Sequence, residues 1–236
     1  MFPGRPLLSP VASSVVTQGV PTAVFLDVDG VLIDSVEVKG EAFVETFDDF
    51  PRSAEKVLEF HRAHGGLTRE IKIRQILESL GNESPADSEI SNRVSRFSDL
   101  VVQRVIDAAE IPGTYEFLSE WSNRCPLYAV SATPGEELQR IMLARGLVPF
   151  FQSVRGWPPE KFELISQEIA SRRFKASECI FVGDSNEDHQ AARRASVPFI
   201  FFGAAQPGVV HASIPRITSW SEFATAVSEI LDRSGS

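Results

Sequence analysis

Short apolar runs, separated by stretches of helical periodicity, dominate the pattern of the chain. The first run, Thr22–Val28, reads TAVFLDV and stays apolar at nearly every position instead of alternating with polar residues. A run of that kind is typical of a strand buried on both faces, as in a parallel sheet covered by helices. Three further runs share the pattern: Leu127–Val130, Cys179–Val182 and Val197–Phe202.

Amphipathic helices are predicted between these strands and after the last one. Their apolar faces are traced by Leu138, Ile141 and Met142; by Leu164, Ile165 and Ile169; by Ala191, Ala192 and Ala195; and by Phe223, Val227, Ile230 and Leu231. Strands that alternate with helices imply parallel pairing through right-handed crossovers. The sequence therefore predicts an α/β protein with a doubly wound, Rossmann-like parallel sheet.

Residues 35–111 show helical periodicity only, with apolar positions recurring around Phe43, Ile76 and Val101. The glycine pair Gly65-Gly66, together with Gly81 and Pro85, punctuates the stretch, and no strand pattern occurs in it. We expect these residues to form a helical second lobe inserted after the first strand. The α/β core then comprises residues 1–34 and 112–236.

Composition narrows the class of partner. The chain has 236 residues and a net charge of −9, which argues against general nucleic-acid binding, because that depends on clustered Lys and Arg. The apolar runs are much shorter than the roughly 20 residues needed to span a bilayer, and the first twenty residues lack a signal-peptide pattern. Cys125 and Cys179 are predicted to be buried free thiols. We expect a cytoplasmic protein.

The most informative segment follows the first strand, where two aspartates, Asp27 and Asp29, precede Gly30. Ligands of open parallel sheets bind beyond the carboxyl ends of the strands. Two carboxylates this close repel each other unless a proton or cation intervenes, and a hard divalent ion such as Mg²⁺ suits oxygen ligands beside a phosphate. Gly30 would let backbone N–H groups approach an anion. The alternative is an ordinary turn rich in Asp and Gly.

The segment resembles the first motif of the haloacid dehalogenase superfamily of phosphotransferases, a strand followed by Asp-x-Asp-Gly-Val. Asp27, Asp29, Gly30 and Val31 match that motif, and Asp34-Ser35 match its continuation in one large subgroup. Three further motifs of the superfamily, each at the end of a later strand, have candidates in the right order.

The second motif is an apolar strand that ends in Ser or Thr, and Ser131 fits it. Its hydroxyl and the following backbone N–H groups, including that of Ala132, would bind phosphate oxygens. The alternative is that Ser131 or Thr133 merely caps the next helix.

The third and fourth motifs supply a cation and further carboxylates. Lys161, just before a helix, would balance negative charge at the transferred phosphoryl group. The run from Cys179 to Asp188 ends a buried strand in Gly183-Asp184, with Asp188 four residues on. Asp184 would complete the metal site, and Asp188 would fix the surroundings of the ion. An ordinary helix start with acidic residues is the alternative.

The resemblance implies a Mg²⁺-dependent phosphatase that hydrolyses a small phosphomonoester of the phosphoglycolate or sugar-phosphate type. Asp27 would attack phosphorus and form an aspartyl phosphate, while Asp29 would serve as general acid and then base. The ion would be held by Asp27, Asp184, Asp188 and the backbone carbonyl of Asp29. Ser131 and Lys161 would hold the phosphoryl oxygens.

Asp29 also separates this chain from two neighbouring activities. Dehalogenases of this fold lack the second acid, and phosphonoacetaldehyde hydrolases replace it with alanine. A mutase resembling β-phosphoglucomutase stays open, although related mutases carry a histidine near the position of Lys39. A catalytically silent binding or regulatory protein is the alternative from another class, and the intact motif residues argue against it.

The inserted lobe resembles a helical cap that closes over the site. Within it, Arg69 would hold a substrate carboxylate or second phosphate, and Lys72 and Lys39 are weaker candidates for substrate binding. We expect His61 and His64 to lie at the surface. The protein is expected to act as a monomer or homodimer on a phosphorylated metabolite, with no nucleic-acid or membrane partner.

Overall fold

The computed structural model describes residues 19–50, 52–204 and 214–234, and the expectation for the first twenty residues lies almost wholly outside them. The strands are β1 (Ala23–Leu26), β2 (Leu127–Pro134), β3 (Ser153–Trp157), β4 (Cys179–Gly183), β5 (Phe199–Phe202) and β6 (Arg216–Ile217). All pair in parallel, in the order β3-β2-β1-β4-β5-β6, so the predicted doubly wound parallel sheet is confirmed.

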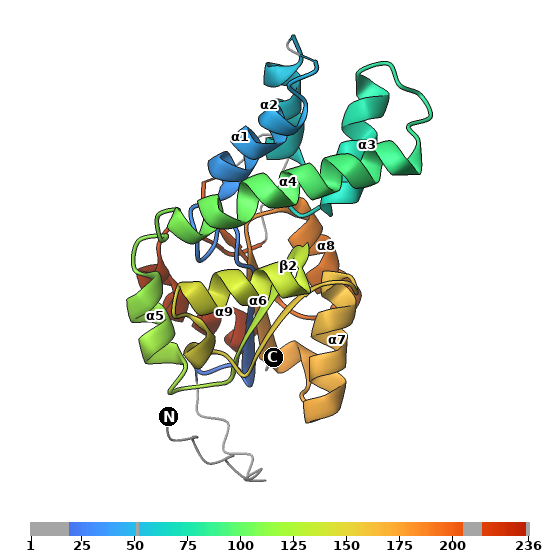
Figure 1. Ribbon diagram of the computed structural model, residues 1–236. Helices are drawn as coiled ribbons and strands as arrows, with labels where there is room; N and C mark the ends of the chain where they lie inside the picture. Colours follow the sequence, from blue (N-terminus) through green and yellow to red (C-terminus); the bar gives the residue numbers. More distant parts are fainter. Residues whose placement is uncertain (1–18, 51, 205–213, 235–236) are drawn as a thin grey trace.

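Helices cover both faces of this sheet (Figure 1). The α-helices are α1 (Val36–Thr46), α2 (Ala54–Ala63), α3 (Arg69–Ser79), α4 (Asp87–Asp107), α5 (Thr114–Trp121), α6 (Gly135–Ala144), α7 (Lys161–Arg172), α8 (Asn186–Ala195) and α9 (Phe223–Ser234). Short 3-10 turns are η1 (Val148–Phe150), η2 (Ala176–Glu178) and η3 (Trp220–Glu222).

Alternate residues of β1 enter two separate apolar cores. Val24 and Leu26 belong to a core that includes the inner faces of α5, α6 and α9. Ala23 and Phe25 belong to a second core that α7 and α8 complete. A strand whose side chains alternate between two apolar layers must be apolar throughout, which explains the unbroken pattern of the sequence.

Helices α1–α4, here called the four-helix unit, lie over one end of the sheet (Figure 1). Two connecting segments join the unit to the core and run side by side: Asp34 N–H donates to Ala109 O at 2.9 Å, and Ile111 N–H donates to Leu32 O at 3.1 Å. The apolar interior of the unit is continuous with the core beneath α5, α6 and α9. The unit is therefore attached at one place and packed over a broad surface.

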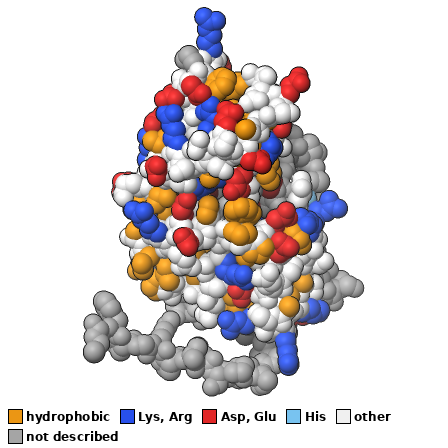
Figure 2. Space-filling model, turned by 45° about the vertical axis from the view of Figure 1, so that its right-hand side comes forward, with side chains coloured by type: hydrophobic (Ala, Val, Ile, Leu, Met, Phe, Trp, Pro, Cys, Tyr) orange, Lys and Arg blue, Asp and Glu red, His pale blue; other side chains and the backbone are white. Residues whose placement is uncertain are grey.

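The surface charges, the apolar content of the helices and the two cysteines bear on the class of the protein. On the face drawn in Figure 2, acidic and basic side chains are interspersed rather than separated by sign. No helix of the described residues has the length and apolar character needed to cross a membrane. Cys125 and Cys179 are buried free thiols, as predicted.

Candidate active site

The strand order brings Asp27 and Asp184 together. β1 lies between β2 and β4, at the point where the chain order of the sheet reverses, and Leu26 is in register with Val182. Asp27 N–H donates to Val182 O at 2.9 Å, so the next residues of both strands leave the sheet edge side by side. Crevices at such reversals are the usual ligand sites of open α/β sheets.

Three carboxylates converge at this edge: Asp27, Asp184 and Asp188 each place an oxygen within 4.8 Å of the others. Asp188 is completely buried at the start of α8, in a capping box where Asp188 N–H donates to Ser185 Oγ at 3.1 Å and Ser185 N–H donates to Asp188 Oδ2 at 3.2 Å. Gly183 makes room for it, since a Cβ at Gly183 would lie 2.5 Å from the Cβ of Asp188. The local sequence, Gly183 and the capping box, thus brings Asp188 into the cluster with Asp27 and Asp184.

Lys161 is the cation that pairs with this cluster. Its Nζ lies 2.8 Å from Asp27 Oδ1 and 2.5 Å from Asp188 Oδ1, and the residue is 8% exposed at the start of α7. Burial opposes the charge, but the two carboxylates outweigh it and raise the pKa of Lys161. Lys161 is therefore a buried, ion-paired lysine beside the acidic cluster.

The cluster holds more negative charge than Lys161 neutralises. Burial, followed by repulsion from Asp188, raises the pKa of Asp27 to about 7, although Lys161 acts in the opposite direction. Burial and repulsion from Asp27 likewise raise the pKa of Asp184. Three carboxylates beside one ammonium leave a net negative charge. The atoms that they offer to a metal ion are all oxygens. That donor set fits a hard divalent cation such as Mg²⁺.

Gly30 is required by the closeness of Asp184. Its φ is +76°, and a Cβ there would lie 2.1 Å from Asp184 Oδ2, so no other residue fits without displacing the carboxylate. The N–H of Gly30 donates to Ile33 O at 2.8 Å. We expected backbone N–H groups here to face an anion, but the N–H of Gly30 is engaged within its own turn.

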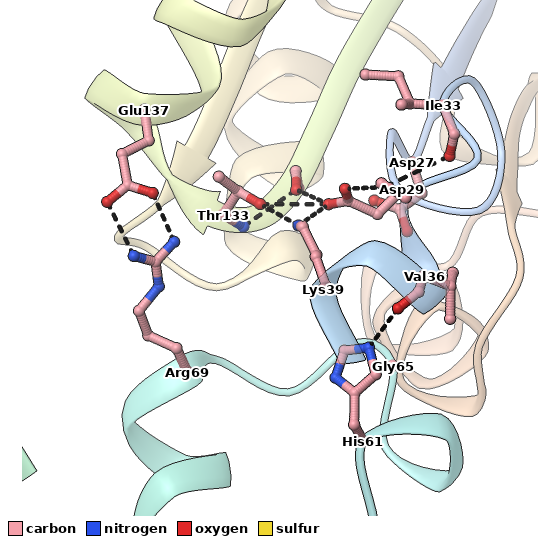
Figure 3. A network of polar contacts seen from close by, with 12 residues as sticks. Asp27, Asp29, Ile33, Val36, Lys39, His61, Gly65, Arg69, Thr133 and Glu137 are labelled. Atoms are coloured by element: carbon pink, nitrogen blue, oxygen red, sulfur yellow. Dashed lines mark hydrogen bonds and ion pairs between the residues drawn. The ribbon is translucent and has the colours of Figure 1, made fainter. Parts of the chain in front are cut away.

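The carboxylate of Asp29 lies in a network of hydrogen-bond donors that includes Lys39 and Thr133 (Figure 3). Ser35 Oγ donates to one carboxylate oxygen at 2.6 Å, and Lys39 Nζ lies 2.5 Å from the other. Thr133 Oγ1 at 3.2 Å and Ser131 Oγ at 3.4 Å donate to that second oxygen. Burial favours a neutral acid, yet the ion pair with Lys39 and the hydrogen bond from Ser35 lower the pKa of Asp29 to about 2.

The end of β2 is longer than predicted. It runs to Pro134, so Ser131 and Thr133 are strand residues and neither side chain caps α6. Ser131 Oγ accepts a hydrogen bond from Thr133 N–H at 3.0 Å and, with Ala132, lines the pocket above Asp27. Thr133 is a site residue that we did not identify from the sequence. Its place two residues after Ser131 was the available signal, since alternate strand residues share a face.

Arg69 links the four-helix unit to the core. Its guanidinium forms a two-pronged ion pair with Glu137 of α6, at 2.8 and 2.6 Å (Figure 3). The guanidinium also donates to Ser98 Oγ. It packs against the ring of Phe97 and is 8% exposed. Arg69 is therefore buried although it is the first residue of α3.

The two histidines of the unit differ from expectation. His61 is 3% exposed and lines the pocket, so the prediction of a surface position was wrong for it. It is buried because α2 packs its inner face on α1, with the His61 ring 5.1 Å from that of Phe43. His64 is half-buried and stacks on Phe60 at 4.2 Å.

One pocket joins these groups. It encloses about 50 Å³ between the acidic cluster of the core and side chains of the four-helix unit, among them Lys39, Arg69 and Lys72. That volume holds a few water molecules, each of which needs roughly 10–15 Å³ by this measure. A phosphorylated metabolite needs more room than this.

Known proteins resemble this chain in sequence over most of its length. The sequence model of the family described as haloacid dehalogenase-like hydrolase matches residues 21–196, a span from β1 to the end of α8 that contains all four motifs. Over 218 residues, 24% are identical to the 6-phosphogluconate phosphatase of Escherichia coli (strain K12), covering 85% of this chain and 92% of the relative.

Solved structures resemble the fold over most of its length. A predicted phosphatase from Clostridium acetobutylicum matches 89% of this chain and 99% of its own, with a TM-score of 0.72 and 16% identity. CbbY from Rhodobacter sphaeroides, in complex with a xylulose bisphosphate, matches 86% of this chain and 96% of its own, with a TM-score of 0.70 and 17% identity.

Proposed function

Because the chain belongs to the haloacid dehalogenase-like hydrolase family, we propose that it is a Mg²⁺-dependent phosphatase of small phosphomonoesters, with Asp27 as its nucleophile. The observation that carries this proposal is the convergence of Asp27, Asp184 and Asp188 around Lys161 at the end of β1. Such a site binds a cation and an anion together, which phosphoryl transfer requires.

In the proposed reaction, an Asp27 carboxylate oxygen attacks phosphorus and the bond to the leaving alcohol breaks, which forms an aspartyl phosphate. Water then attacks phosphorus, releases inorganic phosphate and restores Asp27. Lys161 stays charged through both steps and balances the phosphoryl oxygens. A divalent ion held by Asp27, Asp184, Asp188 and the backbone carbonyl of Asp29 would shield the nucleophile from the anionic substrate.

Asp29 is proposed to move the proton. It would protonate the leaving alcohol in the first step and accept a proton from water in the second. In the conformation described, Lys39 holds Asp29 as a carboxylate, the form that the second step needs. Donation in the first step therefore requires the substrate to separate Lys39 from Asp29.

We propose that residues 35–111 act as a cap that opens for substrate and closes for catalysis. The contacts Lys39–Asp29 and Arg69–Glu137 both cross from the four-helix unit to the core, close to the pocket. The small volume of the pocket between them supports a movement of the unit before a metabolite enters. The paired connecting segments at Asp34 and Ile111 are the natural hinge.

Magnesium should stabilise the folded protein. A ligand at 100 times its dissociation constant adds about 2.7 kcal/mol, which corresponds to about 5–10 °C in melting temperature for a chain of this size. We expect that rise on adding Mg²⁺ to chelator-treated protein, measured by calorimetry. In Asp184→Asn, less than half of the rise should remain, whereas Asp34→Asn, at an exposed position, should keep it. An equal rise in Asp184→Asn would contradict the assigned site.

A phosphate-release screen tests the activity itself. The panel should contain phosphoglycolate, 6-phosphogluconate, sugar phosphates and nucleoside monophosphates, each with Mg²⁺ and with chelator. The relative from Escherichia coli supports the inclusion of 6-phosphogluconate. We expect metal-dependent release from a subset of these compounds. Absence of release from the entire panel would count against the proposed function.

A further inference from the structure

Four cationic side chains line the pocket, and Lys72 differs from the other three in its partners. Within residues 19–50, 52–204 and 214–234, Lys72 forms no ion pair, whereas the other three each hold a carboxylate. These pairs are Lys39 with Asp29, Arg69 with Glu137, and Lys161 with Asp27 and Asp188. Among the four cations, Lys72 is therefore the one that contacts no carboxylate of the described residues.

Lys72 is nevertheless buried, with an exposed fraction of 3%. Its Nζ lies 3.0 Å from Gly65 O and 3.4 Å from His61 Nδ1, and 5.6 Å from the centre of the Phe43 ring. An ammonium has three N–H donors, and these contacts use two of them. The third has no acceptor among the described residues, at a position that lines the pocket.

His61 fixes the orientation of Lys72. His61 Nε2 lies 3.0 Å from Val36 O, and because a carbonyl only accepts, Nε2 carries the hydrogen (Figure 3). Nδ1 is then the acceptor that faces Lys72. Burial and the nearby Lys72 lower the pKa of His61 to about 3, so the ring stays neutral. This neutral acceptor positions the amine without supplying a counter-charge.

The surroundings of Lys72 lack a counter-ion in direct contact. Burial, followed by repulsion from Lys39, lowers the pKa of Lys72 to about 7. Glu187, Asp29 and Asp184 act in the opposite direction, but none reaches ion-pair distance. A buried amine in this state gains a favourable interaction from any anion that enters the pocket beside it.

We propose that Lys72 binds a carboxylate on the alcohol part of the substrate, so that the preferred substrates are phosphorylated acids. This inference rests on the proposed phosphatase function and assigns the specificity of the same pocket. A single ammonium with one available donor suits a singly charged carboxylate. A second phosphate carries up to two charges and three acceptor oxygens, and the arginine that would suit it is already paired with Glu137.

The test compares substrates that differ only in this group. 6-Phosphogluconate carries the carboxylate, sorbitol phosphate replaces it with an alcohol on a chain of equal length, and a hexose bisphosphate replaces it with phosphate. Lys72→Met should lower kcat/KM for 6-phosphogluconate about tenfold to hundredfold, mainly through KM, because a charge-assisted hydrogen bond is lost. For sorbitol phosphate the change should stay below about threefold.

Arg74→Met is the matched control. Arg74 lies on the same helix, is half exposed and pairs with Asp87, so its loss removes one positive charge outside the pocket. We expect this variant to leave the preference between the three compounds unchanged. Melting curves of both variants report folding, and Lys72→Gln replaces Lys72→Met if the latter does not fold.

Binding measured without turnover tests the role of Lys72 separately from the phosphatase function. Calorimetry on Asp27→Asn, with and without Lys72→Met, measures the affinity for each compound in the presence of Mg²⁺. Tighter binding of 6-phosphogluconate than of sorbitol phosphate, lost with Lys72→Met, supports the assignment even where phosphate release fails. An equal loss for both compounds, or a larger loss for the bisphosphate, would overturn it while leaving the phosphatase function intact.

Discussion

Asp27→Asn should lower the rate of Mg²⁺-dependent phosphate release by about 10⁴-fold or more, the usual effect of removing a nucleophile. An amide oxygen at the end of β1 does not attack phosphorus to give a stable acyl phosphate. Folding should persist, because Lys161 keeps its contact with Asp188 and one source of repulsion in the acidic cluster is gone. Steady-state release with the best substrate of the panel, together with a melting curve, measures both effects.

Asp34→Asn is the control for this variant. Asp34 belongs to the same turn, seven residues on, but its side chain is exposed and does not line the pocket. It loses the same charge, and its rate should stay within about threefold of the parent protein. If Asp27→Asn kept a tenth of the parental rate, Asp27 would not be the nucleophile. When the parent protein is quenched with acid during turnover, mass spectrometry should also detect a phosphate on Asp27.

The meeting of Asp27 with Asp184 could be predicted from the sequence, because it depends on local rules. An unbroken apolar run predicts a buried parallel strand, and parallel strands present their carboxyl ends at one edge. Two Asp-bearing motifs that each follow such a run therefore end close together once the strands are neighbours. The register of the two strands, with Leu26 beside Val182, places the two motifs directly side by side.

Other elements escaped the sequence analysis for physical reasons. β3 contains Arg155 and Gly156 and lies at the edge of the sheet, so it lacks the apolar run of a central strand. β6 has two residues, too few to show a period. Helix α5, by contrast, has apolar positions at helical spacing, Phe117, Leu118 and Trp121, and is predictable from the sequence.

Contacts between segments that are distant in the sequence are the hardest feature to predict from the sequence alone. Arg69 and Glu137 are 68 residues apart, and no spacing rule relates them. From the sequence, Arg69 was the favoured residue for substrate binding and Lys72 a weaker one. The structure places Glu137 on Arg69 and leaves Lys72 without an ion pair among the described residues, and our proposal therefore favours Lys72 over Arg69. The pairings behind that proposal are visible only in the folded chain.

The loop after α2 shows how closely the four-helix unit approaches the core. The loop after α2 contains Gly65 and Gly66, and it lies against the start of α8. A Cβ on Gly66 would lie 2.5 Å from Glu187 Cβ and 2.8 Å from Ser185 Oγ. These atoms sit near the backbone of α8, so they have little freedom to move aside.

Gly66→Ala should therefore hold the cap away from the core and lower kcat/KM by about 100-fold, because a displacement of about 1 Å in a closed site has effects of that size. The fold of each part should be retained, since Gly66 has no left-handed backbone angle that alanine would strain. The measurements are phosphate-release kinetics, a melting curve, and the radius of gyration by X-ray scattering, which should increase with substrate analogue bound.

Gly65→Ala is the closest available control for that effect. A Cβ on Gly65 would lie 3.6 Å from Ser185 Cβ, an ordinary van der Waals contact, and its backbone is equally unstrained. The two variants add the same methyl group to adjacent residues of one loop, so they share any change in chain flexibility. We expect Gly65→Ala to keep kcat/KM within about threefold of the parent protein, because it leaves closure unobstructed. Equal losses in both variants would mean that loop flexibility, and not contact with α8, limits the reaction.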